Sequence, residues 1–218
     1  EGKKVAVVSR GYGRASRDGM EVTGTESASL VGDEPLQIKR KFPQVTMMVD
    51  KIRRRAIEKL ISLEDGSRPD IILLDDAFQH RQVTPSRSIV LVNYNRPIFN
   101  DTLLPFGRLR DLPERIADSD TVIITKAPPY LDEWEKEKCR QINRVARHQK
   151  LFFTSIDYAT PLPVFPEAGN SRFIYSQEAI MITGIAYSRP MYEYMMIKYK
   201  SLSCMKFSDH HKFTRLNI

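Results

Sequence analysis

The chain has 218 residues, of which 41% are hydrophobic and 28% charged, enough for one large domain or for one domain and the start of a second. This composition excludes a disordered chain, and no apolar run reaches the roughly 18 residues of a membrane-spanning helix. The net charge of +7 favours an anionic partner, which could be nucleic acid, an acidic membrane surface or a phosphorylated substrate. A solvated basic surface without a partner explains the charge equally well.

The first residues and the cysteines indicate the compartment. Residues 1–4 lead directly into a strand-like run, so we expect no secretory signal. Cys139 and Cys204 are too few for a disulfide framework and lack the spacing of metal ligands. We therefore expect both to be reduced thiols of a cytosolic protein.

Short, continuous apolar runs rich in β-branched residues recur along the chain. The runs are Val5–Val8, Ile71–Leu74, Ile89–Val92, Val122–Ile124 and Ile180–Ile182, and Leu151–Phe153 is a further candidate. Such runs are typical of strands that are buried on both faces, as in a parallel sheet.

Helical patterns lie between these runs. In Asp50–Leu63 the apolar residues fall on one face of a helix, and Tyr130–Arg147 carries an apolar stripe that includes Trp134. Pro190 is suited to the first turn of a third helix. The alternation of strands and helices predicts an α/β fold with a mostly parallel sheet flanked by helices. The proline-rich segment 160–170 is the expected linker or domain seam.

Polar or glycine-bearing clusters follow five of the apolar runs directly. They are Ser9–Arg14, Asp75–Asp76, Asn93, Thr125–Lys126 and Thr183–Gly184. Open α/β sheets bind their ligands beyond the carboxyl ends of the strands. We therefore expect the five clusters to line one crevice.

Asp75 and Asp76 are candidate metal ligands. A hydrophobic strand that ends in a carboxylate holds Mg²⁺ near the phosphates in P-loop enzymes, and this hard cation prefers oxygen ligands. The alternative is an acidic N-cap of a helix. Gln79 and His80 follow closely, and this density of functional side chains favours the metal site.

Two further acidic groups are candidates for catalysis. Asp33 and Glu34 form a pair that could include a general base, although Gly32–Pro35 is also a typical turn sequence. The stretch 209–211, Asp-His-His, could hold a metal, orient a base or cap a helix. It lacks the third His or Cys of a zinc site.

The arginines suggest recognition of phosphate, because guanidinium groups bind phosphate with two hydrogen bonds. One group is Arg53–Arg55 on the predicted helix, where at least two of the three should be solvated. Arg108 and Arg110 lie in a loop. The phosphate-cradling signature G-x-x-x-x-G-K-[ST] does not occur in the chain.

Six motifs together resemble the tetraacyldisaccharide 4'-kinase family of lipid A biosynthesis. They occur in the order of the family and span nearly the whole chain: VVSRGYGR (7–14), GDEP (32–35), DDAFQHR (75–81), LLPFGRLR (103–110), ITGIA (182–186) and FSDHH (207–211). Members are membrane-associated P-loop enzymes that use Mg²⁺ and transfer the γ-phosphate of ATP to the 4'-hydroxyl of a tetraacylated disaccharide 1-phosphate.

The resemblance implies a role for each candidate residue. Asp33 would be the catalytic carboxylate, with His210 as its partner. The metal ligands would be Asp75 and Asp76, with Glu34 close to the ion. The residues that face the anionic disaccharide or the transferred phosphate would be Arg53, Gln79, His80, Arg108 and Arg110. ATP and Mg²⁺ are the implied cofactors.

The resemblance also implies the domain organisation. Residues 1–155 would be a RecA-like, P-loop-kinase domain without its phosphate-binding segment, and residues 156–218 a linker and part of a smaller α/β domain. In the family, the phosphate-binding loop and an amphipathic membrane anchor precede the motifs found here, and the chain continues after the histidine pair. We therefore expect these residues to be a fragment, and its activity without the phosphate-binding loop stays open. The expected location is the cytoplasmic face of the bacterial inner membrane.

Two alternatives stay open from the sequence. One is a non-catalytic basic module that binds anions or nucleic acid, although no aromatic platform accompanies the arginines and no nucleic-acid partner is expected. The other is a different P-loop transferase that shares only the metal-binding strand.

Overall fold

The computed structural model describes residues 2–16, 18–162, 177–185, 187–208, 211 and 214. The chain divides into two compact units, Glu1–Ser155 and Ile156–Ile218. Strands and helices alternate, and all strand pairs but one are parallel in the described residues. The predicted α/β class with mostly parallel pairing is therefore confirmed, but the strands form three sheets and not one.

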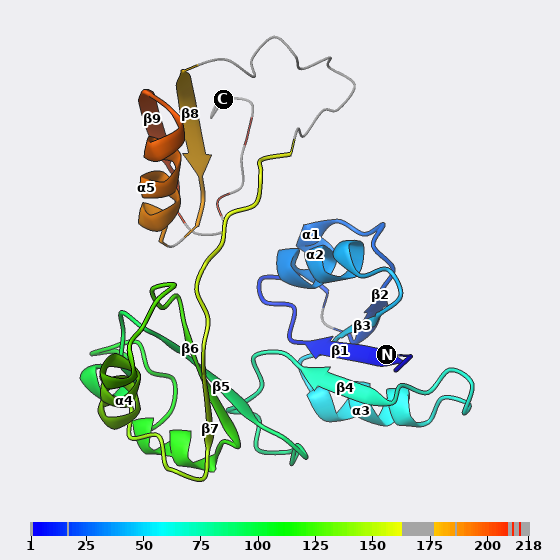
Figure 1. The fold of residues 1–218 in the computed structure, drawn as a ribbon. Helices are drawn as coiled ribbons and strands as arrows, with labels where there is room; N and C mark the ends of the chain where they lie inside the picture. Colours follow the sequence, from blue (N-terminus) through cyan, green and yellow to red (C-terminus); the bar gives the residue numbers. More distant parts are fainter. Residues whose placement is uncertain are drawn as a thin grey trace. The chain divides into compact units, whose positions relative to one another are not determined.

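The first sheet of the first unit has the strand order β2-β3-β1-β4. Its strands are β1 (Val5–Ser9), β2 (Met20–Val22), β3 (Thr46–Val49) and β4 (Ile71–Leu74). β1 is parallel to both of its neighbours, whereas β2 is antiparallel to β3. The helices α1 (Ala28–Val31) and α2 (Asp33–Lys41) lie on one face and α3 (Arg53–Ile61) lies on the other (Figure 1).

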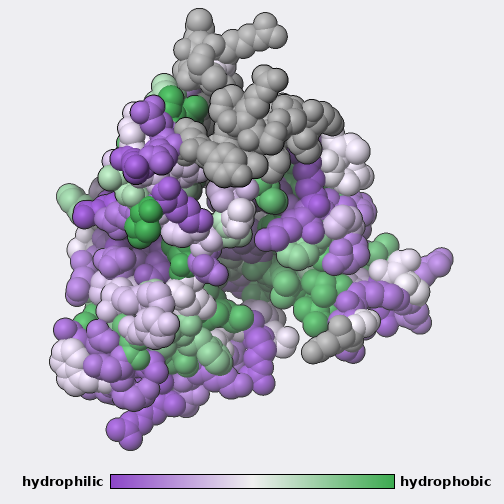
Figure 2. Space-filling model, turned by 45° about the horizontal axis from the view of Figure 1, so that its top comes forward, coloured by the Kyte–Doolittle hydropathy of each residue, from purple (hydrophilic) through white to green (hydrophobic). Residues whose placement is uncertain are grey.

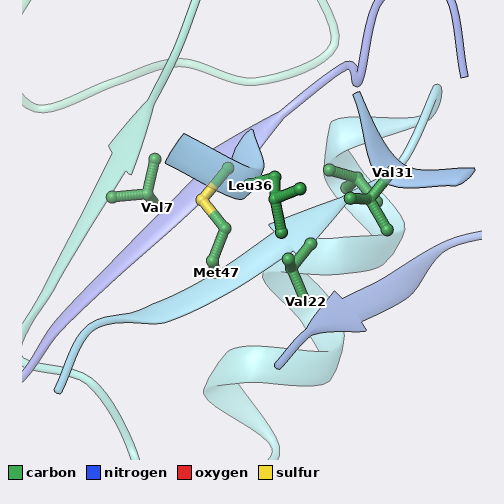
Figure 3. Packing of buried hydrophobic residues seen from close by; sticks show 6 residues of the cluster. Val7, Val22, Val31, Leu36 and Met47 are labelled. Atoms are coloured by element: carbon green, nitrogen blue, oxygen red, sulfur yellow. The ribbon is translucent and has the colours of Figure 1, made fainter. Parts of the chain in front are cut away.

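This sheet has a hydrophobic core on each face. Side chains alternate along a strand, so Val7 of β1 points to one core and Val8 to the other. On the α1–α2 side, Val7 packs with Val22, Val31, Leu36, Met47 and Val49 (Figure 3). On the α3 side the buried residues are Ala6, Val8, Met48, Ala56 and Leu60. The central strands are thus buried on both faces, as the sequence predicts.

The second sheet of the first unit has the order β5-β6-β7 and is fully parallel. Its strands are β5 (Ile89–Asn93), β6 (Thr121–Thr125) and β7 (Lys150–Phe153). Two 3-10 helices, η1 (Ile98–Asn100) and η2 (Pro113–Asp118), and the helix α4 (Glu133–Ile142) accompany it. One core of this sheet contains Val92, Ile116, Val122, Ile124 and Val145.

Burial on both faces was predicted for every apolar run, and this is wrong for several strands. Leu73 of β4 is 53% exposed, and Leu91 of β5 is 66% exposed. Ile71, Ile89 and Phe152 are exposed as well, because helices of the described chain pack against only one face of these strands. Trp134 of α4 is also exposed, although the predicted stripe placed it in the core. Figure 2 shows apolar surface exposed among hydrophilic side chains.

The second unit contains the parallel pair β8 (Glu178–Thr183) and β9 (Ser201–Lys206), joined by α5 (Arg189–Lys198). Pro190 lies in the first turn of α5, as predicted. The Tyr194 ring of α5 stacks on Tyr158 at 4.6 Å between ring centroids, and its hydroxyl donates to the Tyr158 carbonyl. None of the helices in the described residues could cross a membrane.

Candidate active site

The polar clusters that follow the strands separate into three groups. Ser9 ends β1 and Asp75 follows β4, which are neighbouring strands of the first sheet, whereas Asn93 and Thr125 end strands of the second. Thr183 ends β8 in the other unit. The five strands therefore do not belong to one sheet, and the expected crevice lined by all five clusters stays a prediction. Charged side chains gather at the end of the first sheet, where Arg53 and Arg110 both contact Asp76.

Asp75 is fixed at the carboxyl end of β4 by contacts with β1. The two strands are in parallel register, with Val8 opposite Leu74. The Asp75 amide continues this register by donating to the Val8 carbonyl at 2.9 Å. The Ser9 hydroxyl donates to Oδ2 of Asp75 at 3.1 Å. The Asp75 carboxylate is thus held beside the hydroxyl oxygen of Ser9 at the carboxyl edge of the sheet.

Asp76 is bound by two arginines. Its backbone has a positive φ of 46°, and its carboxylate accepts two hydrogen bonds from the Arg110 guanidinium, one of them of 2.9 Å from Nη1 to Oδ2. The hydrogen bond from Arg110 is the main cause that lowers the pKa of Asp76, and burial opposes it. Arg53 donates to the Asp76 carbonyl at 3.1 Å. These contacts bring together three of the predicted site residues from distant parts of the chain.

Arg53 differs from the two arginines that follow it. It begins α3 and is 4% exposed, on the helix face that also carries Ala56 and Leu60, whereas Arg54 and Arg55 are exposed. Burial is the main cause that lowers its pKa, with a further contribution from the charge of Arg10. Its Nε is buried and has no hydrogen-bond partner among the described residues. A buried guanidinium with an unused donor is suited to an anionic ligand.

Asp33 and Glu34 begin α2, and the backbone of the loop after β1 packs against this helix start. Gly32 has a φ of 98°, and a Cβ on it would lie 3.2 Å from the Cα of Gly11. A Cβ on Gly11 would in turn lie 2.8 Å from the Val31 carbonyl oxygen. Side chains at either glycine would separate the two segments, so the glycines hold the exposed Asp33 and Glu34 beside the carboxyl end of β1.

The remaining predicted residues are less closely joined to this cluster. His80 is partly buried, and its Nε2 has no hydrogen-bond partner within the part of the chain that the structure describes. Gln79 and Arg108 are exposed. The Arg108 amide donates to Oδ1 of Asp101 at 3.2 Å. His210 lies outside the described residues, so its pairing with Asp33 stays a prediction.

Sequence reasoning missed Asp50, which is 4% exposed and follows β3. Its amide donates to the Ser9 carbonyl at 3.1 Å, and its Oδ1 accepts from the Ile52 amide at 2.8 Å and from Arg55 at 3.4 Å. Its charge also acts on Arg53. The signal was available in the sequence, because Asp50 directly follows an apolar run, just as Asp75 does.

The donor atoms of this cluster fit a magnesium ion in part. Mg²⁺ binds through one or two carboxylates and keeps several waters, and the Asp75 carboxylate with the Ser9 hydroxyl offers hard oxygen ligands. The Asp76 carboxylate is already engaged by Arg110. Over the described ranges, no three His, Cys, Asp or Glu side chains gather as a metal-binding group. The place of Glu34 close to the ion stays a prediction.

The fold is that of an α/β protein with a cluster of charged side chains at the carboxyl ends of the parallel strands β1 and β4. The sequence profile of the family described as LpxK, Tetraacyldisaccharide-1-P 4'-kinase, matches residues 1–218. The chain therefore belongs to this family, and the resemblance inferred from its motifs is confirmed.

Similar proteins agree with this assignment. A tetraacyldisaccharide 4'-kinase of Porphyromonas gingivalis (strain W83) is 41% identical over 216 residues, which cover 99% of this chain and 60% of that protein. One of Bacteroides thetaiotaomicron is 37% identical, over 98% of this chain and 59% of that protein. The chain thus spans about 60% of the length of these curated relatives.

A solved structure shares the fold. The crystal structure of the "apo" form of LpxK from Aquifex aeolicus in complex with ATP matches with a TM-score of 0.67 and 23% sequence identity. The match covers 97% of this chain and 65% of that chain.

Proposed function

We propose that the protein containing these residues is an ATP-dependent kinase that phosphorylates the 4'-hydroxyl of tetraacyldisaccharide 1-phosphate in lipid A biosynthesis. The family match along all 218 residues is the observation that carries this proposal. The cluster of Asp75, Asp76, Arg53 and Arg110 supports it, because phosphoryl transfer requires mainly positioning and the neutralisation of charge. Neither the comparisons nor the described site favours the alternative of a non-catalytic module that binds anions or nucleic acid.

In this proposal Asp33 accepts the proton of the sugar hydroxyl, and His210 assists it as a partner. Arg53 and Arg110 offset the negative charge on the transferred phosphate. Asp75 and Asp76 hold Mg²⁺, which when bound neutralises phosphate charge and orients the nucleotide. If the Arg110 guanidinium left Asp76 and bound a phosphate instead, the Asp76 carboxylate would become free to bind the ion.

The lipid part of the proposal concerns substrate and location. Two further residues, Gln79 and His80, closely follow the two aspartates in sequence, and Arg108 lies in the same loop as Arg110. We assign these three side chains to binding the head group of the anionic disaccharide. The protein would work as a peripheral protein at the cytoplasmic face of the inner membrane. The basic charge of the chain supports such an anionic partner.

The substitution Asp33→Ala in the full-length gene product tests the proposal. Transfer of labelled phosphate from ATP to the disaccharide should fall by roughly 100-fold or more, because the group that accepts the hydroxyl proton is lost. Affinity for ATP, measured by calorimetry, should change little. A matched control is Asp65→Ala, because the Asp65 side chain is 91% exposed in a turn after α3. Wild-type turnover by Asp33→Ala would contradict the role of Asp33, and no turnover by the wild type would contradict the proposed function.

A further inference from the structure

The loop between residues 101 and 111 exposes large apolar side chains. Phe106 is 94% exposed, Leu104 is 60% exposed and Leu103 is 39% exposed. Single exposed apolar residues are common on protein surfaces. Here three of them lie within four residues, and grouped exposed apolar side chains mark sites of interaction.

The loop is ordered by its own hydrogen bonds, so this exposure is part of its structure. Oδ1 of Asp101 accepts from the amides of Thr102 at 2.8 Å and of Arg108 at 3.2 Å. The Leu109 amide donates to the Thr102 carbonyl at 3.0 Å. A Cβ on Gly107 would collide with Thr102 and Asp101, so the loop closes tightly around this glycine. Within this closed loop the side chains of Leu104 and Phe106 are exposed.

Cationic side chains lie beside the apolar tip. Arg108 and Arg110 follow it within the loop and are both exposed. The Arg81 side chain is 75% exposed and lies 3.9 Å from Asp111 at the end of the loop. Apolar side chains that enter the interfacial layer, flanked by Arg or Lys that meet anionic head groups, are the pattern of a membrane-binding surface.

We propose that the loop 101–111 docks the protein on an anionic lipid bilayer, with Leu104 and Phe106 inserted into the interfacial layer and Arg81 and Arg108 against the head groups, while Arg110 stays with Asp76. The proposal rests on the proposed function in one respect, which is that the substrate is a lipid. Phe106 lies four residues before Arg110, which binds Asp76. Insertion of the tip would therefore hold the carboxylate cluster at the level where the head group of a lipid substrate lies.

A tryptophan reporter tests the insertion in the full-length gene product. Trp134, the single tryptophan of these 218 residues, is replaced by phenylalanine together with any further tryptophan of that product, and Phe106→Trp is introduced. With vesicles of phosphatidylethanolamine and phosphatidylglycerol, we expect the emission to move to shorter wavelength and a soluble quencher to lose access. The matched control is Phe42→Trp, at the other end of α2 from Asp33, where the ring is exposed and Lys41 lies 5.7 Å from its centroid. Its emission should not change.

Vesicle binding of variants with the native tryptophan gives a second measurement. Phe106→Ala should weaken partitioning into the anionic vesicles by roughly 10-fold, as expected for one large apolar side chain, whereas Phe42→Ala should bind as the wild type does. Melting temperatures should stay unchanged in both variants, because each ring is exposed.

Three results would overturn the proposal. The Phe106→Trp reporter could be protected from the quencher before vesicles are added, which would mean that another segment or a second copy covers the loop. It could also stay accessible with vesicles present. Equal binding to vesicles of neutral phosphatidylcholine would remove the role of the arginines. None of these measurements uses ATP or the disaccharide, so their failure is distinct from a failure of the kinase assay.

Discussion

The two sheets of the first unit are built from similar apolar runs but are buried differently. In the four-stranded sheet, the central strands β1 and β3 contribute to two cores, one under α1 and α2 and the other under α3. In the three-stranded sheet, β5, β6 and β7 contribute to one core, and side chains such as Leu91 and Phe152 on the opposite face are exposed. The difference lies in the segments that cover the strands.

The comparison shows what a continuous apolar run can predict. Such a run indicates that both faces of a strand carry apolar side chains. Whether these side chains are buried depends on the segments that connect the strands. In the first sheet, connecting helices lie on both faces. The site residues Asp75 and Asp76 follow β4, the edge strand of the first sheet, where one face is covered and the other exposes Leu73.

The largest effect that we predict from this comparison concerns one pair of leucines. Leu60→Ala removes a side chain that is 1% exposed between α3 and the first sheet, and should lower the free energy of unfolding by about 2–5 kcal/mol. Leu91→Ala changes a side chain of β5 that is 66% exposed, and should lower it by less than about 0.5 kcal/mol. Urea denaturation of both variants of the 218-residue chain measures the two values.

Equal losses in the two variants would break the comparison, because they would show that the exposed face of the second sheet is covered in solution. The substitution removes the same atoms in both variants, so the chemistry of the change is matched. A large loss for Leu60→Ala alone would support the difference in burial.

The fold was predictable from the sequence where strands are long, apolar and rich in β-branched residues. The elements β1, β4, β5, β6, β7 and β8 were all predicted, and so were α3, α4 and α5. The strand β3 (Thr46–Val49) was missed because two of its four residues are methionines, and β2 because it has only three residues. The helix α2 was missed because its sequence is mostly polar and begins at the turn signal Gly32–Pro35.

The candidate site was predictable only in part. The rule that polar residues follow strands found Asp75 and Asp76, and the same rule would have found Asp50 if β3 had been recognised. The burial of Arg53 follows from its helical spacing with Ala56 and Leu60, since residues three and seven apart share a face. The pairing of Arg110 with Asp76 could not be predicted, because the two residues are 34 positions apart and the path of the chain between them is undetermined by the sequence.

A smaller effect is expected at the starts of two helices, one from each region. In α4, beside the second sheet, Asp132 accepts from the Glu135 amide at 2.7 Å and Glu135 accepts from the Asp132 amide, which forms a capping box. In α2 the cap is Gly32, which makes no side-chain hydrogen bond. Asp132→Ala should therefore lower the free energy of unfolding by about 1 kcal/mol. Urea denaturation checks this value.

The neighbouring position supplies the control for the helix start. Glu133 is the first residue of α4, and its side chain is 89% exposed in a contact with Lys136. Glu133→Ala should cost less than Asp132→Ala because an exposed ion pair contributes little. The reverse order would contradict the capping role of Asp132.

The smallest effect on stability concerns two aspartates with lowered pKa values, one beside each sheet. The main cause is the Arg110 side chain for Asp76 but the backbone amide of Ser88 for Asp120. Each folded-state pKa lies below the unfolded value, so the stabilisation is present above the unfolded pKa and is lost as the pH falls through the folded pKa. Arg110→Gln should raise the pKa of Asp76 toward its ordinary value, so that this loss begins at higher pH, and should leave Asp120 unchanged. Carboxyl ¹³C NMR titration measures both groups in one sample.

The effect on stability should be small, because the Asp76 and Arg110 side chains are about half exposed and solvent screens their charges. An unchanged pKa of Asp76 would show that Arg110 does not hold it in solution, and would remove the contact that joins the loop 101–111 to the carboxyl end of β4.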